Sequence, residues 1–421
     1  MKLHRRTLLA ATGAALFAPR AFARQTPDAF TAGGYGGRII RVSTLKPDGP
    51  GSITEAVKAK GARIIVFEVG GVIDLGMKTL RIDEPNVTMA GQTAPAPGIT
   101  FIRGGISVRA NDVIIQHIAV RPGEAGQAKK SGWECDGISA YAASNITVEN
   151  CSITWATDEG LSASGPRFGT GEKGRTPQEW RAGTSSGILF HRNIVAENLS
   201  NSTHSKGEHS KGTLIHDNVW YAVIKQSLYA HNMERNVLFK GGTRADMREN
   251  VVYNAGRRFA HYNLHEGEWG DHQKQEGYIT IAGNTFIPGP STDPKAAAFM
   301  LGGEGDIYLT MFDNELRPLK GSPLPRLGTF GSKKARLNDR QVSSLGAPPT
   351  ARQVAETLAG CGARPWDRDP IDARIVADVR NGTGKIIDSE QEVGGYPVRQ
   401  ATRAPFVEAD WDLDTFERKK R

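Results

Sequence analysis

Four acidic residues in the middle of the chain could together bind a metal ion. Glu134 and Asp136 alternate in a strand-like segment, so their side chains would point to the same side of a strand. Asp158 and Glu159 come next, and the interval from Asp136 to Asp158 is 22 residues, close to one turn of a solenoid. Carboxylate oxygens are the ligands that Ca²⁺ prefers. We therefore predict a Ca²⁺ site; the alternative is a set of unrelated surface acids.

Four basic residues follow these acids along the chain. Lys206, Lys211 and Lys240 each precede a glycine, which leaves the turns around them open. Arg235 lies 24 residues after Lys211, again about one solenoid turn. Basic side chains beside a cation site indicate a polyanionic ligand, bound both directly and through the metal. The alternative is ordinary solvated charge.

Histidine and cysteine patterns point to no second site. His261 and His265 have a spacing that suits zinc only on a helix, and their surroundings are rich in glycine and charge, so we do not expect zinc there. Cys135 and Cys151 could pair, or could lie in the core as free thiols. We find no convincing nucleophile elbow, phosphate loop or dinucleotide motif.

The composition favours a turn-rich β protein. The chain has 421 residues, 49 of them glycine, and only 7% are aromatic. Three cysteines are too few for a disulfide scaffold. The net charge of +8 falls to +4 once the four basic residues of the N-terminal segment are set aside, which is not a nucleic-acid footprint.

Residues 1–23 have the pattern of a cleaved signal peptide. Arg5 and Arg6 precede an apolar run that is too short to span a bilayer, and Ala21-Phe22-Ala23 forms an A-x-A cleavage site. The paired arginines resemble a twin-arginine signal; the alternative is an ordinary Sec signal. We expect an exported protein, periplasmic or secreted. No later run is long and apolar enough for a membrane anchor.

Between about residues 38 and 320 the chain repeats short β-branched runs closed by Gly, Asn or Asp. No tight hairpin signal joins consecutive runs, which argues against a meander or sandwich. An asparagine recurs beside these strands at irregular intervals, namely Asn150, Asn193, Asn218, Asn236, Asn250, Asn284 and Asn314. Stacked turns of a parallel β-helix would align such asparagines into a hydrogen-bonded column. We therefore predict an all-β solenoid; the alternative is that asparagine merely favours turns.

The remaining segments frame this solenoid. Residues 49–59 predict a short helix, with Ser52 as its N-cap and Glu55 three residues later, that covers the open end. Residues 165–185 are polar and glycine-rich and are expected to form a long excursion. We predict a β-helix catalytic domain at 24–322 and a C-terminal extension at 323–421 that wraps it irregularly, with helical character at 350–358.

Several long motifs, in order, resemble bacterial pectate lyases of polysaccharide lyase family 1. They lie at residues 49–56, 90–95, 118–123, 150–159, 204–209, 227–232, 369–376 and 394–397. The resemblance implies a right-handed parallel β-helix and Ca²⁺-dependent cleavage of polygalacturonate by β-elimination. It covers most of the chain after residue 23. The family pattern departs at Ser162, where many members have Asp.

The resemblance also assigns roles. It implies that the calcium ligands are Glu134, Asp136, Asp158 and Glu159, and that Arg235 is the base. Arginine is an unusual base because its pKa exceeds about 12, and a desolvated, cation-crowded setting would lower that pKa.

Substrate binding is implied for three lysines. Lys240 matches the family's second basic residue, and either Lys206 or Lys211 matches its substrate-binding lysine. We expect pectate as the partner, no nucleic acid or membrane partner, and a monomer. Two alternatives stay open: a β-helix hydrolase of the polygalacturonase type, using a pair of carboxylates, and a non-catalytic polysaccharide-binding β-helix.

Overall fold

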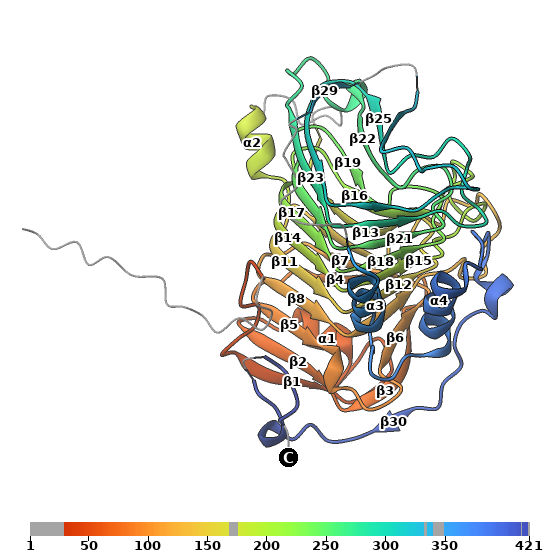
Figure 1. Ribbon diagram of the computed structural model, residues 1–421. Coiled ribbons are helices and arrows are strands. Elements are labelled where there is room, and N and C mark those ends of the chain that lie inside the picture. The colour runs from red at the N-terminus through yellow and green to blue at the C-terminus, as the bar shows by residue number, and fades with distance from the viewer. Residues whose placement is uncertain (1–28, 168–175, 332–334, 340–348, 414, 420–421) are drawn as a thin grey trace, which may run out of the picture.

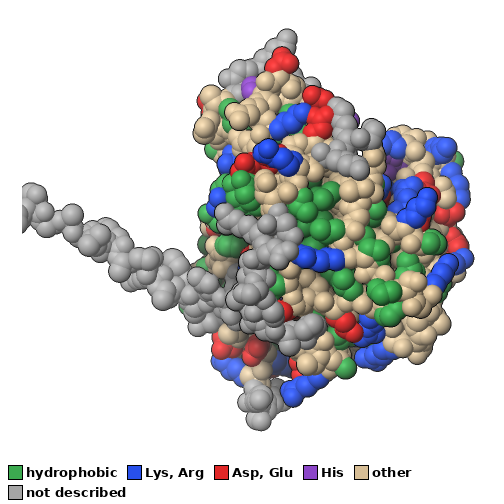
Figure 2. Space-filling model, turned by 45° about the horizontal axis from the view of Figure 1, so that its top comes forward, with side chains coloured by type: hydrophobic (Ala, Val, Ile, Leu, Met, Phe, Trp, Pro, Cys, Tyr) green, Lys and Arg blue, Asp and Glu red, His purple; other side chains and the backbone are tan. Residues whose placement is uncertain are grey.

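The computed structural model describes residues 29–167, 176–331, 335–339, 349–413 and 415–419. The predicted signal peptide at 1–23 lies outside the described residues, as does part of the predicted excursion at 165–185. On the face shown in Figure 2, Lys and Arg side chains are scattered among Asp, Glu and apolar side chains. The mild positive charge of the chain is therefore not gathered into a single patch on that face.

The described chain winds through three sheets in succession, one strand in each per turn (Figure 1). We call them the site sheet, the long sheet and the third sheet. The site sheet contains β4 (Leu80–Ile82), β7 (Ile106–Val108), β10 (Ile138–Tyr141), β13 (Glu159–Ser164), β16 (Lys211–Ile215), β19 (Leu238–Phe239), β22 (Ala260–Leu264), β25 (Phe299–Gly303) and β28 (Leu327–Thr329).

The long sheet follows the site sheet in each turn. It contains β1 (Arg38–Val42), β2 (Arg63–Phe67), β5 (Val87–Ala90), β8 (Val113–Gln116), β11 (Ser144–Glu149), β14 (Ser186–His191), β17 (Trp220–Lys225), β20 (Arg244–Arg248), β23 (Gly277–Ala282), β26 (Asp306–Phe312) and β29 (Arg336–Asp339). The third sheet contains β3 (Val69–Asp74), β6 (Ile99–Ile102), β9 (Ile118–Arg121), β12 (Ser152–Thr154), β15 (Ile194–Ala196), β18 (Leu228–Ala230), β21 (Val251–Tyr253), β24 (Thr285–Ile287), β27 (Glu315–Leu316) and β30 (Thr402–Arg403).

Every strand pairing within the turns is parallel, and the register aligns like with like. The inward position of the long sheet holds Ile146, Ile188, Ala222, Ala245, Ile279 and Leu309 in consecutive strands. These side chains are 5% exposed or less, so the core is a stack of small and branched apolar residues. The predicted parallel β-helix is confirmed.

Part of the predicted asparagine column forms. The backbone N–H groups of Asn250 and Asn284 donate to the side-chain oxygens of Asn284 and Asn314, each at 3.0 Å. Ser227 takes one position of the column, between Asn193 and Asn250. Of the other predicted members, Asn150, Asn218 and Asn236 have partners outside this column. Each buried residue of the column forms a hydrogen bond to the next turn and so fixes the register between successive turns.

A helix covers the first turns of the solenoid, and further short helices lie along its sides. Helix α1 (Ile53–Lys58) begins at the N-cap Ser52, as predicted, and packs against β1 and β4. Helix α2 (Pro177–Ala182) stands beside the long sheet (Figure 1). The short 3₁₀ helices are η1 (Gly91–Thr93), η3 (Glu266–Glu268), η4 (Glu390–Val393) and η5 (Glu408–Asp410).

The C-terminal part of the chain returns along the third sheet. Helices α3 (Ala351–Gly360) and α4 (Pro370–Asn381) bury Val354, Leu358, Ile375 and Val376 in one apolar cluster with residues of β15, β18 and β21. β30 then pairs antiparallel with β3 near the first turn (Figure 1). Strands β28 and β29 extend two of the sheets past residue 322.

Candidate active site

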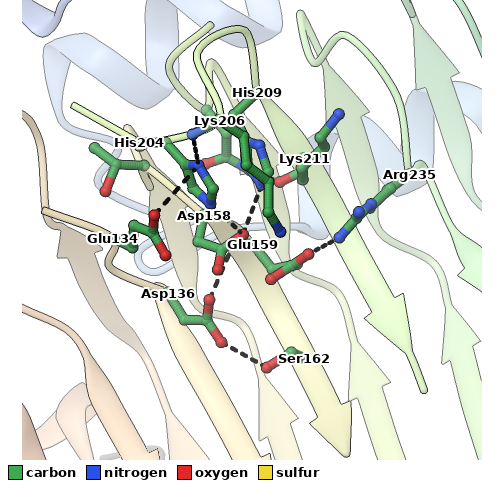
Figure 3. Close-up of polar contacts among 12 residues, drawn as sticks. Glu134, Asp136, Asp158, Glu159, Ser162, His204, Lys206, His209, Lys211 and Arg235 are labelled. Atoms are coloured by element: carbon green, nitrogen blue, oxygen red, sulfur yellow. Dashed lines mark hydrogen bonds and ion pairs between the residues drawn. The ribbon is translucent and has the colours of Figure 1, made fainter. Parts of the chain in front are cut away.

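Three of the four predicted metal ligands lie together on the site sheet (Figure 3). Strands β10 and β13 pair with Ile138 opposite Leu161, which places Asp136 beside Glu159. The Glu159 N–H donates to Asp136 Oδ1 at 3.1 Å, and the Ser162 hydroxyl donates to Oδ2 at 2.7 Å. One carboxylate oxygen from each of Asp136, Asp158 and Glu159 lies within 4.8 Å of the others.

These acids repel one another. Burial, followed by the negative charge of Asp158, raises the pKa of Asp136 to about 7. Burial also acts to raise the pKa of Asp158, but hydrogen bonding and charge from His209, with the charge of Arg235, hold that pKa below its usual range. A hard divalent cation would relieve this repulsion, and the donors are all oxygen. The group therefore fits Ca²⁺.

Two histidines to which the sequence analysis gave no role contact Asp158. The rings of His204 and His209 stack with their centroids 3.7 Å apart and their planes 12° apart. His209 Nε2 lies 2.7 Å from Asp158 Oδ1, and His204 Nε2 lies 3.7 Å from it. Both rings are buried. Their signal in the sequence is the motif at residues 204–209, in the connection between β15 and β16, which the two histidines begin and end.

Glu134, the fourth predicted ligand, lies outside the three-acid group. Its Oε1 accepts hydrogen bonds from the Ser205 N–H, at 3.1 Å, and from the Ser205 hydroxyl. His204 Nδ1 lies 3.5 Å from the same oxygen. The hydrogen bonds from Ser205 lower the pKa of Glu134. In this arrangement Glu134 holds the loop that carries His204, next to the acids.

Arg235 reaches the acids from two turns further along the solenoid. In the sheet register, Glu159 lies beside Lys211 of β16, and Lys211 lies beside Glu234 on the following turn. Arg235 comes directly after Glu234 in the sequence. Its backbone has φ +62°, a left-handed conformation that is strained for a side chain of this size. Its guanidinium forms an ion pair with Glu159, and its Nε is buried without a hydrogen-bond partner. Burial lowers the pKa of Arg235.

The three predicted lysines occupy different environments. Lys211 is 4% exposed and pairs with Glu234; burial, followed by the charges of Arg257 and Arg258, lowers its pKa to about 7. Lys206 is exposed, and its backbone N–H donates to His204 Nδ1 at 3.1 Å. The structure thus places Lys211 inside the site and Lys206 at its rim (Figure 3).

Lys240 lies one strand further, after β19. It is 6% exposed, forms an ion pair with Glu268, and lies 3.4 Å from Asp217 Oδ2. Burial lowers its pKa. Arg235 and Lys211 therefore bring partly desolvated positive charge to the turns that follow the three-acid group, and Lys240 lies beyond them, paired with its own acids.

Of the remaining histidine and cysteine candidates, His261 and the cysteines lie in the core. His261 is buried in β22, and the groups of described residues that could hold a metal do not include it. Cys135 and Cys151 are free and buried, as is Cys361.

Curated proteins of similar sequence are named probable pectate lyase C. Probable pectate lyase C of Emericella nidulans is 33% identical over 374 residues, covering 86% of this chain and 76% of that protein. Probable pectate lyase C of Aspergillus terreus is 30% identical over 371 residues, covering 86% of this chain and 78% of that protein. The chain belongs to the pectate lyase family. This confirms the family predicted from the sequence motifs and, with it, a polysaccharide lyase.

Solved structures resemble this pectate lyase more distantly. A pectate lyase from Xanthomonas campestris has a TM-score of 0.46 at 15% identity, covering 80% of this chain and 98% of that one. A thermostable pectate lyase has a TM-score of 0.48 at 13% identity, covering 79% and 94%. No protein-family model matches the chain. In the described part of this pectate lyase, no helix has the length and apolar character needed to cross a membrane.

Proposed function

We propose that this pectate lyase is calcium-dependent, cleaves polygalacturonate by β-elimination, and uses Arg235 as its base. The observation that carries the proposal is the ion pair of one partly desolvated guanidinium with Glu159, which belongs to a group of three acids on adjacent turns. Each of these residues was expected from the sequence at a separate position. Their convergence supports a single reaction centre.

In the proposed reaction, Arg235 accepts the proton from C5 of a galacturonate residue. The bond from C4 to the glycosidic oxygen breaks, a C4=C5 double bond forms, and the departing oxygen takes a proton from solvent. Removing a proton next to a carboxylate requires that the carboxylate charge be neutralised. Burial favours the neutral guanidine, so the pKa of Arg235 moves in the direction that a base requires.

The residues proposed to hold Ca²⁺ are Asp136, Asp158 and Glu159, with Glu134 as a fourth ligand. When bound, the ion would supply charge neutralisation for the substrate carboxylate. We assign Lys211 and Lys240 to binding further carboxylates of the polymer, because both are buried beside Arg235 or one strand beyond it. Lys206 would contact the polymer at the rim of the site.

The test is an ultraviolet assay on polygalacturonate, since elimination creates an absorbing unsaturated end. We expect absorbance to rise with added Ca²⁺ and to stop rising with EDTA. A polygalacturonase-type hydrolase would shorten the polymer without this absorbance, and a non-catalytic binding β-helix would leave its length unchanged. Either result would overturn the proposal.

We also propose export through the signal at 1–23, a catalytic β-helix at 24–322, an extension at 323–421 that contributes the strands β28 and β29 to the sheets, and a monomer. The motifs of the N-terminal segment support export, and the packing of α3 and α4 on the third sheet supports an extension that does not fold separately. N-terminal sequencing of protein from the periplasm or culture medium tests the first point. Light scattering tests the last.

A further inference from the structure

A column of arginine and aromatic side chains runs along the start of the long sheet, outside the site described above. Trp220, Arg244, Tyr278 and Tyr308 occupy the same register position in β17, β20, β23 and β26. Arg181 of α2 adds a fifth member at one end. The pairing of β17 and β20 shifts register after Trp220, and a bulge of this kind re-aims the side chain at the strand start. We call these five residues the Arg–aromatic column.

The two guanidinium groups are held by stacking. The Cζ of Arg181 lies 4.0 Å from the centroid of the Trp220 ring, and that of Arg244 lies 4.3 Å from it. Arg244 Cζ also lies 4.8 Å from the ring of Tyr278, which stacks on Tyr308 at 4.9 Å and 6°. The rings therefore fix the planes of both guanidiniums, and because stacking uses only the faces, hydrogen bonds can form in those planes.

Neither guanidinium has a carboxylate partner among the described residues. In the part of the chain that the structure describes, Arg181 donates to neutral oxygens, those of Asn218 at 3.2 Å, Gly242 at 3.4 Å and the Gln275 side chain. The Nε atoms of Arg181 and Arg244 are buried without a hydrogen-bond partner. Burial, followed by the charge of Arg244, lowers the pKa of Arg181. Two neighbouring cations without a counter-ion form a receptor for anions.

All members of the column except Tyr308 line a cleft of about 680 Å³. Two acids also line it: Asp306 is paired with Arg336, and Glu276 accepts a hydrogen bond from the Tyr278 hydroxyl at 2.6 Å. Lys274 pairs with Glu304 and Glu266. These ion pairs neutralise the charges of Asp306 and Lys274. The remaining charged residues are Arg181, Arg244 and Glu276, so the lining of the cleft has a net positive charge.

The column is connected to the active-site region through α2. Trp180, next to Arg181, contacts Trp269 with ring centroids 4.7 Å apart. Trp269 Nε1 donates to Asp217 Oδ1 at 3.0 Å, and Asp217 faces Lys240. Arg181 also contacts the backbone of Gly242, two residues after Lys240. The cleft therefore lies next to the segment that carries Lys240.

We propose that the Arg–aromatic column is an accessory binding site for uronate carboxylates of the same polymer, outside the catalytic site. The inference rests on the proposed function for its ligand. A long polyanion offers a carboxylate on every sugar, and planar guanidiniums bind carboxylates through paired hydrogen bonds. Holding a remote part of the chain raises the effective concentration of sugars at the catalytic site. Long substrates would benefit and short ones would not.

The test measures binding without turnover. Arg235→Ala and its double variants with Arg244→Gln or Arg181→Gln are run in native gels that contain polygalacturonate, and in gels with neutral dextran. We expect each double variant to bind polygalacturonate at least fivefold more weakly than Arg235→Ala, with no change in dextran. Arg352→Gln, at an 87% exposed side chain on α3, is the matched control. Equal retardation of all variants would overturn the proposal.

A second measurement uses the active enzyme and keeps the two proposals apart. For Arg244→Gln, the ratio of kcat/KM on polygalacturonate to kcat/KM on trigalacturonate should fall at least fivefold; an unchanged ratio would overturn the accessory site. Circular dichroism melting checks folding, and Arg181→Gln, on the peripheral α2, repeats the test if Arg244→Gln melts early. Absence of unsaturated product from the unmodified enzyme would refute the proposed function, whereas the gel measurement would still report on the column.

Discussion

Arg235 and Glu159 form an ion pair although they belong to turns of the solenoid that are two strands apart on the site sheet. The left-handed backbone at Arg235 directs the guanidinium across the turn that carries Lys211. The pair therefore joins the proposed base to the proposed metal ligands.

Arg235→Ala should abolish most turnover and retain polymer binding. A positioned proton acceptor contributes roughly 10²–10⁴-fold to rate, so we expect a fall of that size in kcat. The ultraviolet assay measures it, and native gels with polygalacturonate measure binding. Arg352→Ala should keep the original rate. A rate for Arg235→Ala close to that of the unmodified enzyme would show that another group removes the proton.

Asp136→Asn should weaken calcium binding at least tenfold, because it removes one carboxylate from the three-acid group. Isothermal titration with Ca²⁺ measures the affinity directly. Glu134→Gln is the matched comparison: as a ligand, Glu134 should give a loss of similar size. If Glu134→Gln binds Ca²⁺ normally, Glu134 serves only to hold the loop through Ser205.

Stability should fall in acid because His261 is buried without a charge. Burial, followed by the charge of Arg258, lowers the pKa of His261 well below its ordinary value, and its Nδ1 has no hydrogen-bond partner. The unfolded chain gains a proton below about pH 6.5 that the folded chain does not, so the stabilisation is complete above that pH and declines below it.

The slope from one such histidine is about 1.4 kcal/mol per pH unit. Urea unfolding at several pH values between 7.5 and 5 measures it. His261→Phe should flatten the curve, because the ring already lies against Phe330 with centroids 5.5 Å apart. A variant curve parallel to that of the unmodified protein would assign the acid sensitivity to other groups.

Arg121→Ala should destabilise the protein by about 3–5 kcal/mol, because it leaves the buried Asp372 without its ion-pair partner, whereas Asp369 keeps Arg399 at 2.9 Å. Arg121 is fully buried and contacts Asp369 at 2.7 Å and Asp372 at 3.1 Å, at the start of α4. Urea unfolding measures the loss, and limited proteolysis should then cut the C-terminal extension sooner. A loss under 1 kcal/mol would mean that apolar packing alone anchors α4.

The fold was predictable because strand-length apolar runs and asparagines recur along the sequence. The members of the asparagine column were predicted only in part. Asn218 and Asn236 form their hydrogen bonds elsewhere, and Ser227 takes a place in the column. The strands past residue 322 were not foreseen, because their runs are short and polar.

The acids and Arg235 were predicted from their types and intervals. Lys206 and Lys211 were not separable, because both stand in the same Ser-Lys-Gly context. The register of β13 with β16 distinguishes them, and register is a property of the assembled sheet. His204 and His209 were missed for a related reason: their stacking depends on the path of a connection that no local pattern specifies.

The antiparallel pairing of β30 with β3 joins an early turn of the solenoid to residues that are synthesised much later. Thr402 donates to Ala96 O at 2.6 Å, and the Ala404 N–H donates to Glu68 O at 3.0 Å. A nascent chain emerges from the ribosome N-terminus first, so this clasp cannot close until nearly the whole polypeptide has been made. The first turns of the solenoid are therefore translated well before residues 402–404, which close over them.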